Sequence, residues 1–102
     1  MKECCRTFLN EQFGGDADIM GEIYGEYVSS VHEKLAEADQ AFAASDWNRL
    51  DKVAHTVKGN ALAAGDAEMA DTAIALRKAA TLSDAGLSSS LIGKLKELSK
   101  GL

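Results

Sequence analysis

Residues 46–66 of the chain read DWNRLDKVAHTVKGNALAAGD, and this stretch indicates the fold. Its apolar residues recur at intervals of three and four, which is the spacing of one face of an α-helix. They are Leu50, Val53, Ala54, Val57 and Ala61. The pair Ser45-Asp46 at its start and Gly65 near its end are typical helix start and stop signals. We therefore predict an amphipathic helix over about 46–63.

The same pattern continues on both sides of this stretch. Apolar stripes at helical spacing predict further helices at about 17–43, 67–82 and 89–100. The stripes comprise Met20, Tyr24, Tyr27, Val31, Leu35, Ala38 and Phe42 in the first, Met69, Ala73, Leu76 and Ala80 in the second, and Leu91, Leu95 and Leu98 in the third. A shorter helix is predicted at about 3–12, because Phe8 and Leu9 can dock it onto the others.

No proline interrupts these segments, and glycine and capping residues separate them. The predicted breaks are Gly14-Gly15-Asp16, Ser45-Asp46, Gly65-Asp66 and Asp84-Ala85-Gly86. Short connections between amphipathic helices favour antiparallel neighbours. We therefore predict an all-α fold in which residues 1–102 form a single domain. The expected architecture is an up-down four-helix bundle with a short extra N-terminal helix across one end.

The composition argues against several classes of function. The net charge is −5 and the lysines and arginines are scattered along the chain, so we expect no nucleic-acid partner. No apolar run approaches the roughly 20 residues of a membrane span, and the first residues do not resemble a secretory signal. We therefore expect a cytoplasmic protein without a membrane partner. Metal-binding patterns such as His-x-x-x-His and Glu-x-x-His are absent, so no metal site is expected.

The two histidines differ in their positions on the predicted helices. At about 100° per residue, His55 lies about 140° from the centre of its helix's apolar arc and so faces solvent. Asp51, Lys58 and Gly59 border it along the same exposed strip of the helix. His32 flanks the apolar stripe of the 17–43 helix, and we interpret it as an ordinary boundary histidine.

The residues of the strip around His55 also have a chemical interpretation. An exposed imidazole is largely neutral at pH 7 and has a nitrogen lone pair that can attack phosphorus. A phosphoryl group on His55 would carry close to two negative charges, which the ammonium of Lys58 can partly offset. Glycine inside a helix costs about 1 kcal/mol relative to alanine, so Gly59 indicates a need for space beside the imidazole. Such a strip also occurs by chance on many helices, which leaves an ordinary surface as the alternative.

The longer string from Ala54 to Gly65, AHTVKGNALAAG, resembles the signature of the histidine phosphotransfer family. Phe13-Gly14-Gly15-Asp16 and Ser45-Asp46-Trp47 are also similar to family members, so the resemblance covers nearly the whole chain. It implies a four-helix bundle with the histidine on the first helix of the C-terminal hairpin.

The resemblance also implies a role for each residue of the motif. By that resemblance His55 is the phosphoacceptor, and Lys58 is the cation on the phosphate side. Gly59 is the position that leaves clearance, and Asn60 is the small polar position, where serine is more usual.

Arg77 is a departure from the family pattern. If the hairpin turns near Gly65, Arg77 lies about level with His55 and points toward the neighbouring helix. The family commonly has glutamine or glutamate here, bonded to the non-reacting imidazole nitrogen, and arginine cannot accept that hydrogen bond. Arg77 therefore either helps to hold the phosphoryl group or is an interhelical cation whose stem covers apolar surface.

The resemblance implies a phosphorelay carrier in two-component signalling, a phosphoprotein rather than an enzyme. It would accept a phosphoryl group on His55 from a receiver-domain aspartate or a kinase and transfer it to another receiver. The expected partners are response-regulator receiver domains and a sensor or hybrid histidine kinase, and the carrier is expected to be a monomer. No cofactor of its own is expected, because the receiver supplies Mg²⁺. The alternative is a degenerate bundle that binds receivers without being phosphorylated.

The receiver-docking surface is expected beside His55, on the first helix and the start of the second. Phe8, Phe13, Ile19 and Ile23 outnumber the apolar side chains that one short terminal helix needs for its own docking. The family resemblance places the receiver at the same position.

Overall fold

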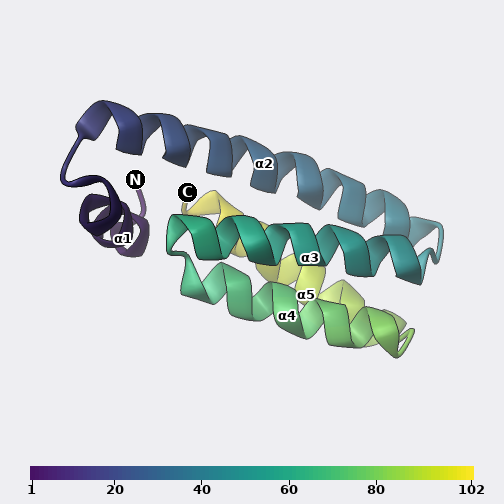
Figure 1. Cartoon of the computed structure of the whole chain (residues 1–102). Helices are drawn as coiled ribbons and strands as arrows, with labels where there is room; N and C mark the ends of the chain where they lie inside the picture. Colours follow the sequence, from purple (N-terminus) through teal and green to yellow (C-terminus); the bar gives the residue numbers. More distant parts are fainter.

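The computed structural model describes all 102 residues and contains five α-helices (Figure 1). They are α1 (Glu3–Phe13), α2 (Ala17–Ala43), α3 (Trp47–Ala64), α4 (Ala67–Thr81) and α5 (Ala85–Lys100). Helices α2 to α5 run alternately up and down, and α1 packs across the end at which α2 begins and α3 ends (Figure 1). No strand is present, so the predicted all-α bundle with a short N-terminal helix is confirmed.

The four connections share one local design, in which a residue with left-handed backbone precedes an aspartate that caps the next helix. The φ angles are +80° at Gly15, +52° at Ser45, +77° at Gly65 and +51° at Ser83. The aspartates Asp16, Asp46, Asp66 and Asp84 each accept a hydrogen bond from a backbone N–H three residues later, at 3.2, 3.1, 3.3 and 3.0 Å. Each cap satisfies a donor that the helix leaves free, so each connection is also a helix start.

The predicted start of the fifth helix at about residue 89 is wrong. Helix α5 begins at Ala85, because Asp84 caps it by accepting a hydrogen bond from the backbone N–H of Leu87 at 3.0 Å. Gly86 therefore lies in the first helical turn and does not separate two helices. The buried face of α5 is also displaced from the predicted stripe: Leu95 is buried, whereas Leu91 and Leu98 are only half-buried. Ser88, Ile92 and Ser99 are the other buried residues of this helix.

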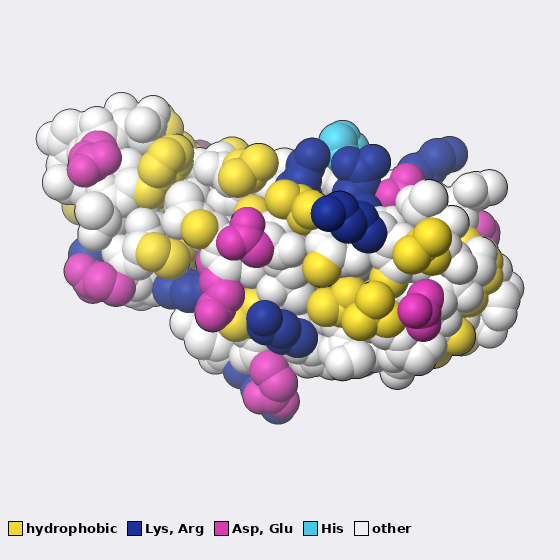
Figure 2. Space-filling model, turned by 90° about the horizontal axis from the view of Figure 1, so that it is seen from below, with side chains coloured by type: hydrophobic (Ala, Val, Ile, Leu, Met, Phe, Trp, Pro, Cys, Tyr) yellow, Lys and Arg dark blue, Asp and Glu magenta, His cyan; other side chains and the backbone are white.

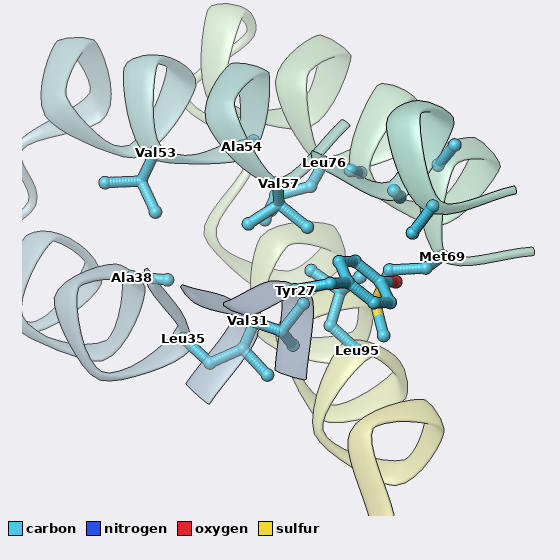
Figure 3. Packing of buried hydrophobic residues seen from close by; sticks show 14 of the residues in the cluster. Tyr27, Val31, Leu35, Ala38, Val53, Ala54, Val57, Met69, Leu76 and Leu95 are labelled. Carbon is cyan, nitrogen blue, oxygen red and sulfur yellow. The ribbon is translucent and has the colours of Figure 1, made fainter. Parts of the chain in front are cut away.

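The other helix boundaries agree closely with the predicted ones, and the four bundle helices bury their apolar stripes in one core of 22 buried residues. Figure 3 shows side chains of α2, α3, α4 and α5 meeting there, among them Val31, Val57, Leu76 and Leu95. All predicted core residues of α3 and α4 are buried, and Phe42 of α2 is half-buried. Burial of these stripes is the main source of stability, because it removes apolar surface from water.

A buried carboxylate ties the N-terminal segment to the bundle. Asp66 has no solvent exposure, and besides capping α4 it binds the ammonium of Lys2 at 2.9 Å and the hydroxyl of Tyr27 at 2.7 Å. Burial and the hydrogen bond to Asp66 raise the pKa of Tyr27 well above its usual value, so the phenol stays neutral and donates. A Cβ at Gly65 would overlap Phe8. Helix α1 is therefore held at the bundle end by both packing and charge.

None of the five helices combines the length and the apolarity that a bilayer span requires.

Candidate functional site

His55 lies on the exposed face of α3, near the middle of the bundle. Its neighbours Val53, Ala54 and Val57 are buried in the core, and this burial fixes the rotation of the helix. Because successive residues of a helix are about 100° apart, the imidazole must then point away from the core. The predicted exposure of His55 is confirmed.

The structure gives Arg77 two partners on α3. Its Nε donates a hydrogen bond to Oδ1 of Asp51 at 2.9 Å, and its Nη1 lies 3.0 Å from Nδ1 of His55. Asp51 and His55 are one helical turn apart, so a single guanidinium from α4 reaches both. The predicted level of Arg77 is confirmed. Arg77 is an interhelical cation, as one of the two readings expected, and it also contacts the ring itself.

The cations near His55 come together only in the folded chain. Lys58, Arg77 and Lys78 line a groove of about 570 Å³ between α3 and α4, in which Asp51 is the only carboxylate. Figure 2 shows lysine and arginine side chains gathered around a histidine on this face. The groove is therefore locally positive although the net charge of the chain is −5. A local excess of cations favours a dianionic group such as a phosphoryl group.

Lys58 is half-buried and takes part in none of the ion pairs of the chain. The only carboxylate in its groove, Asp51, is paired with Arg77. The ammonium of Lys58 is thus available to an incoming anion without first breaking an ion pair.

Gly59 and Asn60 have different environments. A Cβ at Gly59 would meet no atom within 4 Å, so nothing inside the chain requires a glycine there. Asn60 instead turns toward α2, where its side-chain amide donates a hydrogen bond to the hydroxyl of Ser30 at 2.6 Å. The structure therefore brings Lys58, Gly59 and Arg77 around His55 and directs Asn60 to an interhelical contact.

The four residues expected at the docking surface are not equally accessible. Phe13 and Ile19 are exposed, at 39% and 41%, at the end of the bundle that α1 covers. Ile23 is half-buried and lines a groove between α2 and α3, and Phe8 is half-buried against the core. Leu62, which is not among these four residues, is 54% exposed on α3. The sequence does indicate this exposure, because Leu62 lies off the apolar stripe of α3 and two turns from His55 on the same face.

His32 is exposed on α2 and makes no hydrogen bond or ion pair, so no neighbouring side chain orients its ring. The structure brings together no group of three or more His, Cys, Asp or Glu side chains that could hold a metal ion.

Fold and site together define a class of protein: a helical bundle that presents one histidine among cations on an open helix face. Comparison with known proteins gives the family, since the family model for the Hpt domain matches residues 22–100. The chain therefore belongs to the Hpt, or histidine phosphotransfer, domain family. Such domains are phosphocarriers in two-component signalling and interact with receiver domains and histidine kinases. Searches of curated proteins and of solved structures found no match.

Proposed function

We propose that the chain is a phosphorelay carrier that accepts a phosphoryl group on His55 from a receiver-domain aspartate and transfers it to another receiver. The observation that supports this most is the placement of an exposed imidazole beside a locally positive groove and an open glycine position. An imidazole needs only a free lone pair to attack phosphorus, so no second catalytic side chain is required.

In this proposal the carrier and the receiver supply different groups to the transfer reaction. It offers a nucleophile and cations that can compensate the charge of a bound phosphoryl group. The aspartyl phosphate, the Mg²⁺ ion and most of the stabilisation of the transition state come from the receiver. The carrier therefore needs an accessible His55 and a surface that holds the receiver's active site in line with the ring.

The docking surface runs from His55 toward the end of the bundle that α1 covers. Leu62 lies two helical turns from His55, about 11 Å along α3. Ile23 and Ala63 line the groove between α2 and α3, and Phe13 and Ile19 are exposed at the end of the bundle that α1 covers. The open position at Gly59 lies between the imidazole and Leu62, so a partner can approach the ring without meeting a side chain.

Incubation with labelled, phosphorylated receiver domains from the same genome tests the proposal. A carrier gains acid-labile label from at least one receiver and passes it to a second. A degenerate interaction module binds receivers but gains no label. That module has one observation in its favour, because Arg77 occupies one ring nitrogen of His55. Binding without labelling would establish the module and exclude the carrier.

We expect Lys58→Ala to slow phosphoryl transfer about tenfold while changing the free energy of unfolding by no more than about 0.5 kcal/mol. Lys58 has no ion-pair partner to lose, whereas a phosphoryl group on His55 loses a compensating charge. Transfer rates and urea unfolding measure the two effects separately. A fall in stability together with an unchanged transfer rate would contradict the assignment.

We expect Phe13→Ala and Ile19→Ala each to weaken receiver binding by about tenfold, the usual effect of truncating an important interface side chain. Leu87→Ala is the matched control, because Leu87 is a similarly exposed apolar residue on α5. Titration with a fluorescently labelled receiver measures the affinity. Unchanged affinity in both variants would show that the receiver docks elsewhere.

A further inference from the structure

The guanidinium of Arg77 restricts the proton of the imidazole to one nitrogen. Nη1 of Arg77 lies 3.0 Å from Nδ1 of His55. Arginine has five N–H donors and no acceptor, so the ring nitrogen that faces it must offer its lone pair. A neutral imidazole has one protonated and one unprotonated nitrogen. With Nδ1 accepting, the proton of the neutral ring lies on Nε2.

This tautomer is the wrong one for attack at the outer nitrogen. A protonated Nε2 has its electron pair in the aromatic ring and cannot form a bond to phosphorus, and Nδ1 is covered by Arg77. The ring becomes a nucleophile at Nε2 only when Arg77 releases Nδ1 and the proton moves there.

Asp51 makes that release unfavourable. Its Oδ1 accepts a hydrogen bond from Nε of Arg77 at 2.9 Å, and the two side chains are both about one-third exposed. A planar guanidinium held at Nε has its remaining nitrogens directed along a fixed fork. Asp51 thus directs the guanidinium of Arg77, which comes from α4, toward the ring of His55. Asp51 and His55 are one turn apart on α3.

We propose that Arg77, held in place by Asp51, is a positioning residue that sets the tautomer of His55. Its contact with Nδ1 disfavours the tautomer that can attack phosphorus and favours the ring once it is phosphorylated. The proposal rests on His55 being the phosphoacceptor.

The transfer step shows how both effects arise. The Nε2 lone pair forms the N–P bond as the P–O bond of the aspartyl phosphate breaks, and the receiver carboxylate leaves with the electron pair of that bond. The ring then has a positive charge, which it loses as the Nδ1 proton passes to water. Nδ1 regains its lone pair, and Arg77 can bond to it again. The phosphorylated ring is therefore compatible with the Arg77 contact, whereas the attacking ring is not.

The same contact protects the N–P bond. Cleavage of this bond is easier when the ring is protonated at Nδ1, because the neutral imidazole is then the leaving group. A guanidinium on Nδ1 competes with that proton. Arg77 is thus expected to prolong the lifetime of the phosphorylated state and to slow its formation.

The tautomer is measured directly by ¹⁵N NMR of the unphosphorylated protein, at alkaline pH where an imidazole is neutral. We expect His55 of the parent to have its proton on Nε2 and His55 of Arg77→Gln to shift toward Nδ1, because the glutamine carbonyl can accept from that nitrogen. Asp51→Asn is expected to shift it in the same direction but less. Arg49→Gln is the matched control, because Arg49 on α3 also bonds a side chain of a neighbouring helix, Gln40 of α2, but does not contact His55.

The kinetic test uses phosphoramidate, a small P–N donor that can phosphorylate histidine without a partner protein. Arg77→Gln is expected to gain label about fivefold faster and to lose it about fivefold faster than the parent, the effect of one exposed hydrogen bond. Arg49→Gln is expected to match the parent in both rates. Unchanged circular dichroism of Arg77→Gln is required for the two rates to report on the ring contact and not on a loss of folding.

The outcomes separate this inference from the proposed function. A labelled parent with its ring proton on Nδ1, or with a tautomer and rates that Arg77→Gln leaves unchanged, would overturn the role of Arg77 alone. A parent that gains no label on His55 from phosphoramidate or from any receiver would overturn the proposed function and the role of Arg77 in transfer with it.

Discussion

We expect His55→Gln to abolish the acid-labile, alkali-stable label that a phosphorylated receiver transfers to this chain. No other side chain combines an exposed imidazole with a positive groove and an open glycine position. Glutamine is similarly polar and has no nitrogen lone pair that can attack phosphorus. At an exposed helix position the substitution changes the free energy of unfolding by only about 0.5 kcal/mol, so loss of label would report on chemistry.

His32→Gln is the matched control for this experiment. His32 is also an exposed histidine in the middle of a helix, but no side chain bonds its ring, and it is on α2, whereas the cationic groove lies between α3 and α4. This variant should therefore label nearly as well as the parent. Label that persists in the His55→Gln protein, with circular dichroism unchanged, would mean that another residue is the acceptor.

The largest loss of stability is expected from Asp66→Ala. Removal of this buried carboxylate leaves the Tyr27 hydroxyl and the Lys2 ammonium without their partner and removes the cap of α4. Breaking a buried ion pair and a helix cap together should lower the free energy of unfolding by about 4 kcal/mol. For a domain of this size that corresponds to a fall in Tm of about 15 °C or more. Urea unfolding and thermal melts measure the change.

Asp46→Ala separates the buried contacts from the cap. Asp46 caps α3 through the backbone N–H of Arg49 at 3.1 Å, in the same geometry as Asp66, but it is exposed. Loss of a cap alone should cost about 1 kcal/mol. Equal losses of unfolding free energy in the two variants would show that the contacts of Asp66 with Lys2 and Tyr27 contribute nothing to the stability of the bundle.

The helices and the orientation of His55 could be predicted from the sequence because their causes are local. The apolar spacing around Val53 and Val57 fixes which face of α3 is buried, and His55 then has to face outward. The aspartate caps are local in the same way, since each acts on an N–H three residues away. The sequence misplaces the start of α5, because Gly86 suggests a break although the nearby Asp84 is the cap.

The contacts that decide the chemistry of the site depend on the tertiary structure. Asp51 and Arg77 are 26 residues apart in the sequence, and His55 and Arg77 are 22 apart. A hairpin that turns near Gly65 places Arg77 about level with His55. Which atom of this long side chain meets which ring nitrogen depends on how the core packs α4 against α3. The sequence by itself therefore determined the bundle and its exposed histidine. Only the packing of one helix against another decided that Nδ1 of that histidine faces Arg77.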